Sequence, residues 1–356
     1  MNRTESFANV VATPVQACLV SVVVPNYNHG EFLPRCLAAI EAQTHRPYEV
    51  VLIDDASSDN SIEVIEQFSP RLPRFRLIRH DENLGVVAGM NEGLHLASGT
   101  HVLFAAADDW IEPDLIAESV RWLNRYPESG LCSALTRLAD EKGAIAGPFR
   151  TPLPRWTAGY ISPAEAVRQL ANDDTWFNGN TTIVNRSAAI AAGGYRPELA
   201  SFCDGFLNAN LAWSHGACFI PRFLAVWRRL ETGYAASVTA NPDSLVKIFN
   251  AIRYISTGGD VPKQCSGRWS ARWQFMAARG ALEPCPEVRR QQLLSIVPAN
   301  IRALVSLLEH LARIPLIGRL SASAFLFFLL RLRDIAPVAR RRLEWIALGG
   351  ILEARR

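Results

Sequence analysis

The sequence predicts an α/β protein with a mostly parallel central sheet flanked by helices, of the Rossmann-like kind, followed by a helical C-terminal extension. Two observations predict this class. Short β-branched apolar runs alternate with stretches of helical periodicity up to about residue 240, which is typical of βαβ units. Beyond that point long apolar helical patterns dominate. We therefore divide the chain into a leader at 1–17, an α/β domain at 18–240 and a helical extension at 241–356.

The first half of the α/β domain has the most regular pattern. A near-continuous β-branched run over 19–24 fits a strand buried on both faces. Apolar residues three and four positions apart predict a helix over 32–40. Gly99 is expected to cap the third helix of the alternation. The remaining elements expected in this half are strands at 49–53, 75–78 and 101–106 and helices at 61–68, 86–97 and 112–126.

The second half of the domain is less regular. Glycine and proline are frequent over 136–156, which predicts loops around a hairpin. A helix is expected from Ser162, which fits an N-cap because Pro163 suits the first turn. The last elements expected are a helix ending at 170, a strand at 178–184, a helix at 206–215 and a strand at 218–227.

Composition and charge restrict the class of protein. A hydrophobic fraction of 49% and a charged fraction of 20% are typical of a globular chain. A net charge of +3 gives no indication of nucleic-acid binding. The segment from Arg313 to Arg356 is basic and apolar, with nine arginines against three acids. Peripheral contact with an anionic membrane is one interpretation of this tail, and packing on the α/β domain or a second subunit is the one that we favour.

Cysteine usage indicates the cellular compartment. The seven cysteines are odd in number, irregularly spaced and without a C-x-x-C pair, so the sequence predicts neither a disulfide framework nor a zinc site. The first 16 residues lack the basic start and long apolar core of a signal peptide. We therefore expect a cytoplasmic protein, placed at the inner face of the membrane if its tail binds there.

Polar clusters follow the predicted strands, at the sheet edge where open α/β proteins bind ligands. Pro25-Asn26-Tyr27-Asn28 can place an aromatic ring against a nucleobase, or it is simply a strand-ending turn. Asp54 to Asp59 offers carboxylates to a base N–H or a ribose hydroxyl, while Ser58 or Asp59 could cap the next helix. Asn83-Leu84-Gly85 allows close backbone approach to a ligand, with a turn and helix start as the alternative.

The fourth cluster is the adjacent pair Asp108-Asp109. Two neighbouring acids at the end of a buried strand repel each other unless a cation or hydrogen bonds neutralise them. A hard divalent ion that also binds phosphate oxygens is one solution. Solvated acids that cap the following helix are the alternative.

Taken in this order, the four clusters resemble those of family 2 glycosyltransferases, which have the A-type nucleotide-sugar-binding fold. Ala192 to Arg196 resembles the family's Gly-Gly-aromatic turn, Cys203 to Leu207 resembles its acidic motif, and the resemblance covers about residues 19–237. It implies inverting transfer of a sugar from a nucleotide-diphosphate donor, with UDP expected, to a hydroxyl of a saccharide or lipid-linked acceptor. A nucleotide-sugar-binding protein that has lost turnover is the alternative.

The resemblance also implies residue roles. Asp204 would be the general base, and Asp109 would bind Mn²⁺ or Mg²⁺. The donor-binding residues that it implies are Pro25, Tyr27, Asn28, Asp54, Asn83, Gly85 and Asp108.

Two departures and one further segment bear on the site. Cys203 stands where the family commonly has Glu. The family's late His is absent, so Arg228 or the adjacent Arg229 could supply positive charge to the donor instead. Trp176 and Asn178 lie where acceptor-facing residues often occur, and we interpret Phe177 as a core residue in preference to Trp176.

Overall fold

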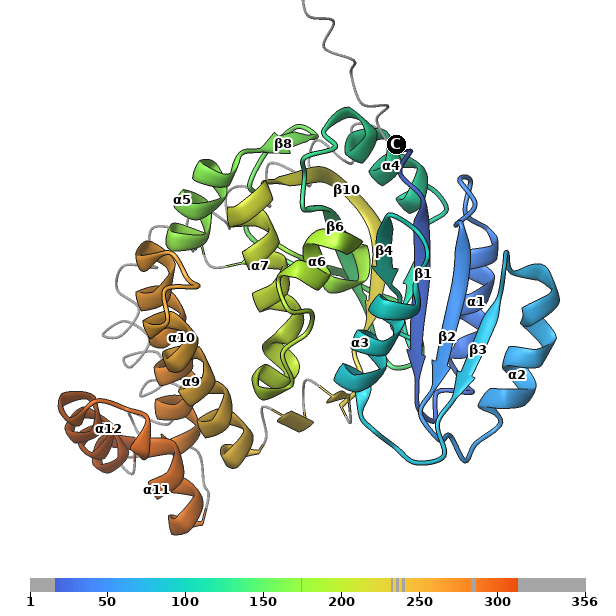
Figure 1. Ribbon diagram of the computed structural model, residues 1–356. Coiled ribbons are helices and arrows are strands. Elements are labelled where there is room, and N and C mark those ends of the chain that lie inside the picture. The colour runs from blue at the N-terminus through green and yellow to red at the C-terminus, as the bar shows by residue number, and fades with distance from the viewer. Residues whose placement is uncertain are drawn as a thin grey trace, which may run out of the picture.

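A computed structural model describes residues 17–312 apart from 174, 232, 235–236, 239–240 and 283–285. Its described residues form one mixed sheet flanked by helices, with further helices packed beside one end (Figure 1). The predicted α/β class with a helical C-terminal region is confirmed. The leader up to residue 16 and the basic tail from residue 313, with its predicted membrane contact, lie outside the described residues.

The strands of the described chain have the order β3-β2-β1-β4-β9-β6-β10-β5, with β7 beside β6 and β8 beside β10. Their bounds are β1 Val20–Asn26, β2 Glu49–Asp54, β3 Arg76–Arg79, β4 His101–Phe104, β5 Trp110–Ile111, β6 Leu131–Ala139, β7 Ile145–Pro148, β8 Gly159–Ile161, β9 Ile183–Asn185 and β10 Ala217–Arg228.

The α-helices are α1 Leu33–Glu41, α2 Ser61–Phe68, α3 Val86–Leu96, α4 Leu115–Arg125, α5 Pro163–Asp173, α6 Arg186–Ala191, α7 Cys203–His215, α9 Pro242–Thr257, α10 Lys263–Leu282, α11 Glu287–Ser295 and α12 Ala299–Ala312. The 3₁₀ helices are η1 Ser69–Arg71, η2 Gly179–Thr181 and η3 Pro197–Phe202.

The parallel half of the sheet consists of β3, β2, β1 and β4. Every residue of β2 is buried, as its apolar run predicts for a strand covered on both faces. The register places Asn26 opposite Asp54. The parallel strands therefore bring the first two polar clusters to the same edge of the sheet.

The other half is mixed, because β9 is antiparallel to both β4 and β6. The strand predicted at 178–184 begins as the 3₁₀ helix η2, and only its end belongs to β9. The hydroxyls of Thr181 and Thr182 both donate to the Asn178 carbonyl, at 3.0 and 2.9 Å. These local bonds replace a strand ladder. The loops predicted over 136–156 do contain a hairpin, formed by β6 and β7.

Gly99 has a different role from the predicted cap. Helix α3 ends earlier, with Ala97 at its C-cap. A Cβ atom at Gly99 would lie 2.6 Å from the Leu19 carbonyl oxygen and 2.7 Å from Ser21 Oγ. Glycine at this position therefore allows the chain to pass close to the start of β1.

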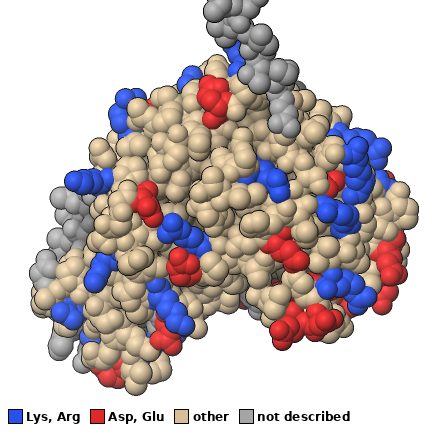
Figure 2. Space-filling model, in the orientation of Figure 1, with Lys and Arg blue, Asp and Glu red and all other residues tan. Residues whose placement is uncertain are grey.

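The C-terminal helices share a hydrophobic core with the α/β part. The Phe202 ring lies edge-on to Trp269 and Trp273 of α10, with centroid distances of 5.4 and 5.7 Å. No helix within the described residues is both long and apolar enough to cross a bilayer. Basic and acidic side chains are interspersed over most of the face in Figure 2.

Candidate active site

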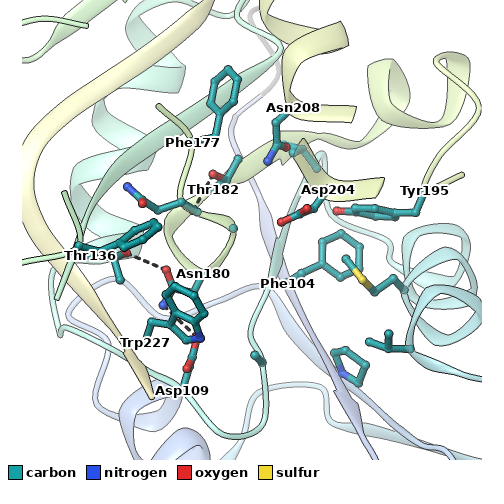
Figure 3. Close-up of a pocket in the computed structure, with 18 residues that line it drawn as sticks. Phe104, Asp109, Thr136, Phe177, Asn180, Thr182, Tyr195, Asp204, Asn208 and Trp227 are labelled. Atoms are coloured by element: carbon teal, nitrogen blue, oxygen red, sulfur yellow. Dashed lines mark hydrogen bonds between the residues drawn. The ribbon is translucent and has the colours of Figure 1, made fainter. Parts of the chain in front are cut away.

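A cavity of about 360 Å³ lies among the α/β elements, where loops that follow the sheet meet α3 and α7 (Figure 3). Its polar lining is formed by Asp109, Thr136, Asn178, Asn180, Thr182, Asp204 and Asn208. Its apolar lining is formed by Pro25, Val86, Met90, Phe104, Ala106, Phe149, Phe177, Val184, Tyr195 and Trp227. No lysine or arginine lines it in the described part of the chain.

Asp109 is held in a fixed orientation at one end of the cavity. Its Oδ1 accepts from the backbone N–H of Arg228 at 2.8 Å, and its Oδ2 accepts from Asn180 Nδ2 at 3.0 Å. The Thr136 hydroxyl donates to Asn180 Oδ1 at 2.7 Å, which orients that amide toward Asp109 (Figure 3). The carboxylate is therefore positioned from three segments that are far apart in the sequence.

The electrostatics of Asp109 reflect its burial beside a second carboxylate. Burial, and then the adjacent Asp108 carboxylate, raise the pKa of Asp109, while its bonds from Arg228 N–H and Asn180 oppose that rise. Mg²⁺ typically binds one or two protein carboxylates and completes its shell with phosphates and waters. The pair fits such an ion, because each Asp109 oxygen has a second lone pair. No group of three or more His, Cys, Asp or Glu that could hold an ion occurs among the described residues.

Asp204 lies in the first turn of α7, on the same cavity. Its Oδ1 accepts from the N–H of Gly205, and its Oδ2 lies 2.9 Å from where a Cβ at Gly179 would be. Burial raises the pKa of Asp204, against the smaller opposing effects of backbone hydrogen bonds and Arg272. Cys203, which stands where the family commonly has Glu, is buried, and burial raises the pKa of its thiol. A carboxylate with a raised pKa is suited to accept a proton near neutral pH.

The first two polar clusters form a network at the carboxyl edge of the parallel strands. Asp54 is only 1% exposed, and its oxygens accept from Asn26 Nδ2 at 2.8 Å and from Ser57 N–H at 3.1 Å. Asn28 Oδ1 accepts from the N–H of Ser58 at 2.8 Å. Asp54 therefore joins the loops that follow β1 and β2, and no oxygen of its carboxylate lacks a protein partner.

Asp55, which the sequence reasoning did not single out, extends this network to the third cluster. Its two oxygens accept from the backbone N–H groups of Leu84 and Gly85, both at 2.8 Å. Asn83 Oδ1 also accepts from Gly85 N–H, at 3.0 Å. Three clusters that are separate in the sequence are thus brought together, as expected from the edge at which parallel strands end.

The other predicted donor-binding residues differ in their positions. Pro25 lines the cavity. Tyr27 is 46% exposed, and Asn28 and Asn83 are exposed in the loops of this edge. Asp108 is half-buried beside Asp109.

Arg228 has a different position from the one expected. Its Nε donates to the Asp108 carbonyl at 3.0 Å and its Nη1 donates to the Glu141 carbonyl at 2.7 Å. The guanidinium lies 4.6 Å from the centroid of the Phe32 ring, and it does not line the cavity. Only the backbone N–H of Arg228 reaches Asp109. The side chain therefore stabilises the Asp108-Asp109 turn through the Asp108 carbonyl, without lining the cavity.

The two residues predicted to face the acceptor lie in different environments. Trp176 is only 1% exposed and belongs to the hydrophobic core, whereas Phe177 lines the cavity. Asn178 does line it, and donates from Nδ2 to the Ala134 carbonyl at 2.7 Å. The sequence alone does not assign a role to Thr136 or Asn180. No motif or periodicity marks a side chain whose contribution is to orient another residue, as Asn180 orients Asp109.

The chain is similar in sequence to several known proteins. Residues 21–188 match the sequence model of glycosyl transferase family 2. An uncharacterised protein of Mycobacterium tuberculosis is 34% identical over 217 residues, which are 60% of this chain and 60% of the relative's own length. A PGL/p-HBAD biosynthesis glycosyltransferase of the same organism is 35% identical over 116 residues, 32% of this chain and 45% of that protein.

Solved structures share the fold at low sequence identity. TarS of S. aureus in complex with UDP-GlcNAc superimposes with a TM-score of 0.59 at 16% identity, over 88% of this chain and 92% of that one. The mannosyltransferase PcManGT of Pyrobaculum calidifontis, in complex with GDP-Man and Mn²⁺, gives 0.55 at 20% identity over 92% and 90%. The likeness extends into the C-terminal helices, since it covers nearly nine-tenths of the chain.

Proposed function

The α/β domain of this chain belongs to glycosyl transferase family 2, and from that premise we propose that the protein is an inverting glycosyltransferase. It moves a sugar from a nucleoside-diphosphate donor, UDP in our proposal, onto an acceptor hydroxyl. The observation that carries the proposal is the pairing of two carboxylates, Asp109 and Asp204, on one cavity. In this proposal, Asp109 organises the leaving diphosphate and Asp204 accepts a proton.

The donor nucleotide is proposed to lie along the carboxyl edge of the parallel strands. Tyr27 supplies an exposed ring for the base, and the loop from Asn83 to Gly85 supplies polar groups at the same edge of the sheet. Asp54 and Asp55 hold these loops together rather than pointing at solvent. Pro25 lines the cavity where this edge meets it, which is where the donor sugar would continue.

We propose that Asp109, with the adjacent Asp108, holds Mn²⁺ or Mg²⁺ together with the donor diphosphate. When bound, such an ion stabilises the negative charge that develops on the leaving diphosphate. The composition of the cavity supports this assignment, because no lysine or arginine among its described lining residues could neutralise that charge. Asn180 and Arg228 N–H keep the Asp109 carboxylate oriented toward that position.

Asp204 is proposed as the general base. Its carboxylate takes the acceptor hydroxyl proton while the acceptor oxygen forms a bond to the anomeric carbon and the bond to the diphosphate breaks. A single displacement of this kind inverts the anomeric configuration. The raised pKa of Asp204 supports the role, because a base with a pKa nearer neutrality transfers protons more efficiently.

The acceptor is proposed to enter past Phe177 and Asn178. Phe177 offers an aromatic face in the cavity lining. Asn178 Oδ1 is buried and has no hydrogen-bond partner among the described residues. A hydroxyl of a saccharide or lipid-linked acceptor would satisfy that oxygen. The relative named a PGL/p-HBAD biosynthesis glycosyltransferase supports transfer onto an acceptor in general.

Calorimetric titration of UDP with and without Mn²⁺ tests the donor site. Wild-type protein should bind UDP only with the metal, and Asp109→Ala should lose that binding because the diphosphate loses its bridging ion. Glu66→Ala is the matched control, since Glu66 is exposed on α2 and does not line the cavity. Absence of UDP binding in every protein would contradict the choice of nucleotide, and GDP, CDP and dTDP would then be titrated.

Asp204→Asn tests the chemistry separately from binding. We expect UDP affinity to stay within about twofold, while hydrolysis or transfer from a UDP-sugar falls by roughly 10²- to 10⁴-fold. NMR of the product would give the anomeric configuration. An Asp204→Asn protein with full turnover would contradict the assignment of the base, and a retained configuration would contradict a single displacement.

A further inference from the structure

His80 lies at the end of β3, between two carboxylates from different elements. Its Nδ1 is 2.7 Å from Asp55 Oδ1, and its Nε2 is 2.7 Å from Glu92 Oε2 on α3. The imidazole is only 9% exposed. The ring therefore connects the end of β2, the end of β3 and helix α3, at the edge where the donor nucleotide is proposed to bind.

The geometry of these two contacts favours one protonation state of the ring. Ionised carboxylates only accept hydrogen bonds, and a neutral imidazole has a single N–H. A neutral ring would therefore direct a nitrogen lone pair at one of the two carboxylates. Both 2.7 Å contacts are satisfied at once when both ring nitrogens carry protons, so the arrangement fits an imidazolium and two charge-assisted hydrogen bonds.

Asp55 transmits this contact to the donor edge. The oxygen that accepts from His80 also accepts from Leu84 N–H, and the other oxygen accepts from Gly85 N–H. Gly85 is the N-cap of α3, where a carboxylate is favoured by the helix dipole. Val86 in the first turn of α3 lines the cavity. Asp55 thus holds the backbone of the loop directly before Val86, the first residue of α3 and part of the cavity lining.

We propose that His80 is a positioning residue whose imidazolium form holds the loop 81–85 and the start of α3 in the conformation that binds the donor nucleotide. The proposal rests on the donor site assigned above. Loss of the proton removes one of the two charge-assisted bonds and the positive charge that faces Asp55, so Asp55 is held less firmly and donor affinity falls. His80 touches neither substrate nor reacting atoms in this assignment.

The charges around the ring give the direction of the effect. Asp55 and Glu92 raise the pKa of His80 by hydrogen bonding and by charge, against the opposing effect of burial. The neighbouring residues in the chain, Arg79 and Asp81, are exposed. Because the pKa of His80 is raised above the ordinary value of about 6.5, the ring keeps its proton to a higher pH than a free histidine does. Donor affinity should therefore be highest below the pKa of His80 and fall as the pH rises through it.

The test measures the dissociation constant of UDP with Mg²⁺ from about pH 6 to 9.5, in four proteins. Wild-type affinity should fall by about tenfold across the titration, the effect of one pKa unit of coupling. His80→Gln should bind UDP more weakly at low pH, with the dependence removed. Glu92→Gln should move the midpoint to lower pH because it removes one stabilising charge. His95→Gln is the control, since His95 lies exposed on the same helix, and it should follow the wild type.

Affinity ratios between proteins at each pH cancel the ionisation of UDP itself. Nitrogen-detected NMR of the wild type reports the protonation of the imidazole directly, with the His80 signal assigned by its absence in His80→Gln. A neutral His80 at pH 6, or an unchanged pH dependence in His80→Gln, would overturn the proposal. If UDP binds at no pH, the donor assignment fails instead. In that case, the positioning role would be supported separately if the Leu84 and Gly85 amide signals shifted with the same pH midpoint as the His80 ring.

Discussion

At the scale of single residues, the cavity depends on close contacts such as that between Gly179 and the proposed base. This glycine lies in the 3₁₀ helix η2, directly against the Asp204 carboxylate. A Cβ atom there would be 2.9 Å from Asp204 Oδ2, which is closer than Cβ atoms in real proteins come to a neighbouring atom. The absence of a side chain at 179 therefore leaves room for the proposed base to face the cavity.

Replacing Gly179 with alanine should impair turnover more than binding. The added methyl group would force the Asp204 carboxylate to rotate, and a displacement of about 1 Å in a reacting group can cost roughly 100-fold in rate. We expect kcat to fall at least tenfold with UDP affinity unchanged. Gly267→Ala on α10 is the control, because no described heavy atom lies within 4 Å of a Cβ built there. Equal kcat in the two variants would argue against a role for Asp204.

The strands of the parallel half are joined by a buried carboxylate as well as by their backbone ladders. Glu49 at the start of β2 accepts from Ser21 Oγ on β1 at 2.6 Å, from Ser98 N–H at 2.5 Å and from Arg76 on β3 at 2.9 Å. Burial would raise the pKa of Glu49, but the hydrogen bonds and the Arg76 charge together lower it. The carboxylate connects β1, β2, β3 and the loop before β4.

Glu49→Gln should reduce stability at neutral pH and flatten its dependence on acid. A lowered pKa means that the stabilisation is present above the unfolded value of about 4.3 and is lost as the pH falls through the folded value. We expect about 1–3 kcal/mol less unfolding free energy at pH 7, and little difference from wild type near pH 3. Urea denaturation from pH 3 to 7 measures this, with Glu63→Gln on the exposed side of α2 as the control. A constant deficit across that range would contradict the charge-based account.

The two parts of the molecule are joined through their cores. Phe202, Phe206 and Trp213 surround Trp269 of α10, with ring centroids 5.4 to 5.9 Å apart. Trp269 is 2% exposed. The boundary that the sequence suggests near residue 240 therefore marks a change of architecture along the chain. Independent folding of its two sides is not implied by that change.

We expect the whole protein to unfold in one cooperative calorimetric transition, and Trp269→Ala to destabilise it by about 3–5 kcal/mol. Tyr254→Ala is the matched aromatic control, because Tyr254 is 80% exposed on α9. Two separate transitions in the wild type, with only one of them shifted by Trp269→Ala, would show instead that the C-terminal helices fold as an independent unit.

The sequence by itself determined the fold class and the edge of the sheet that carries the site. The apolar run of β2 predicts a strand buried on both faces, and all six of its residues are buried. Parallel strands end at one edge, so the order of the polar clusters predicts that Asn26, Asp54 and the loop at Asn83 meet there. Periodicity and strand order are local properties of the chain, which is why they can be interpreted without coordinates.

Only the tertiary structure decided which side chains face the cavity. Phe177 lines it and Trp176 does not, although the two are adjacent in the sequence. Arg228 contributes its backbone N–H while its guanidinium packs behind the turn. Asn180 reaches Asp109 across 71 positions of sequence. The direction of a loop side chain depends on contacts with residues far away in the chain, and local sequence patterns carry no information about those contacts.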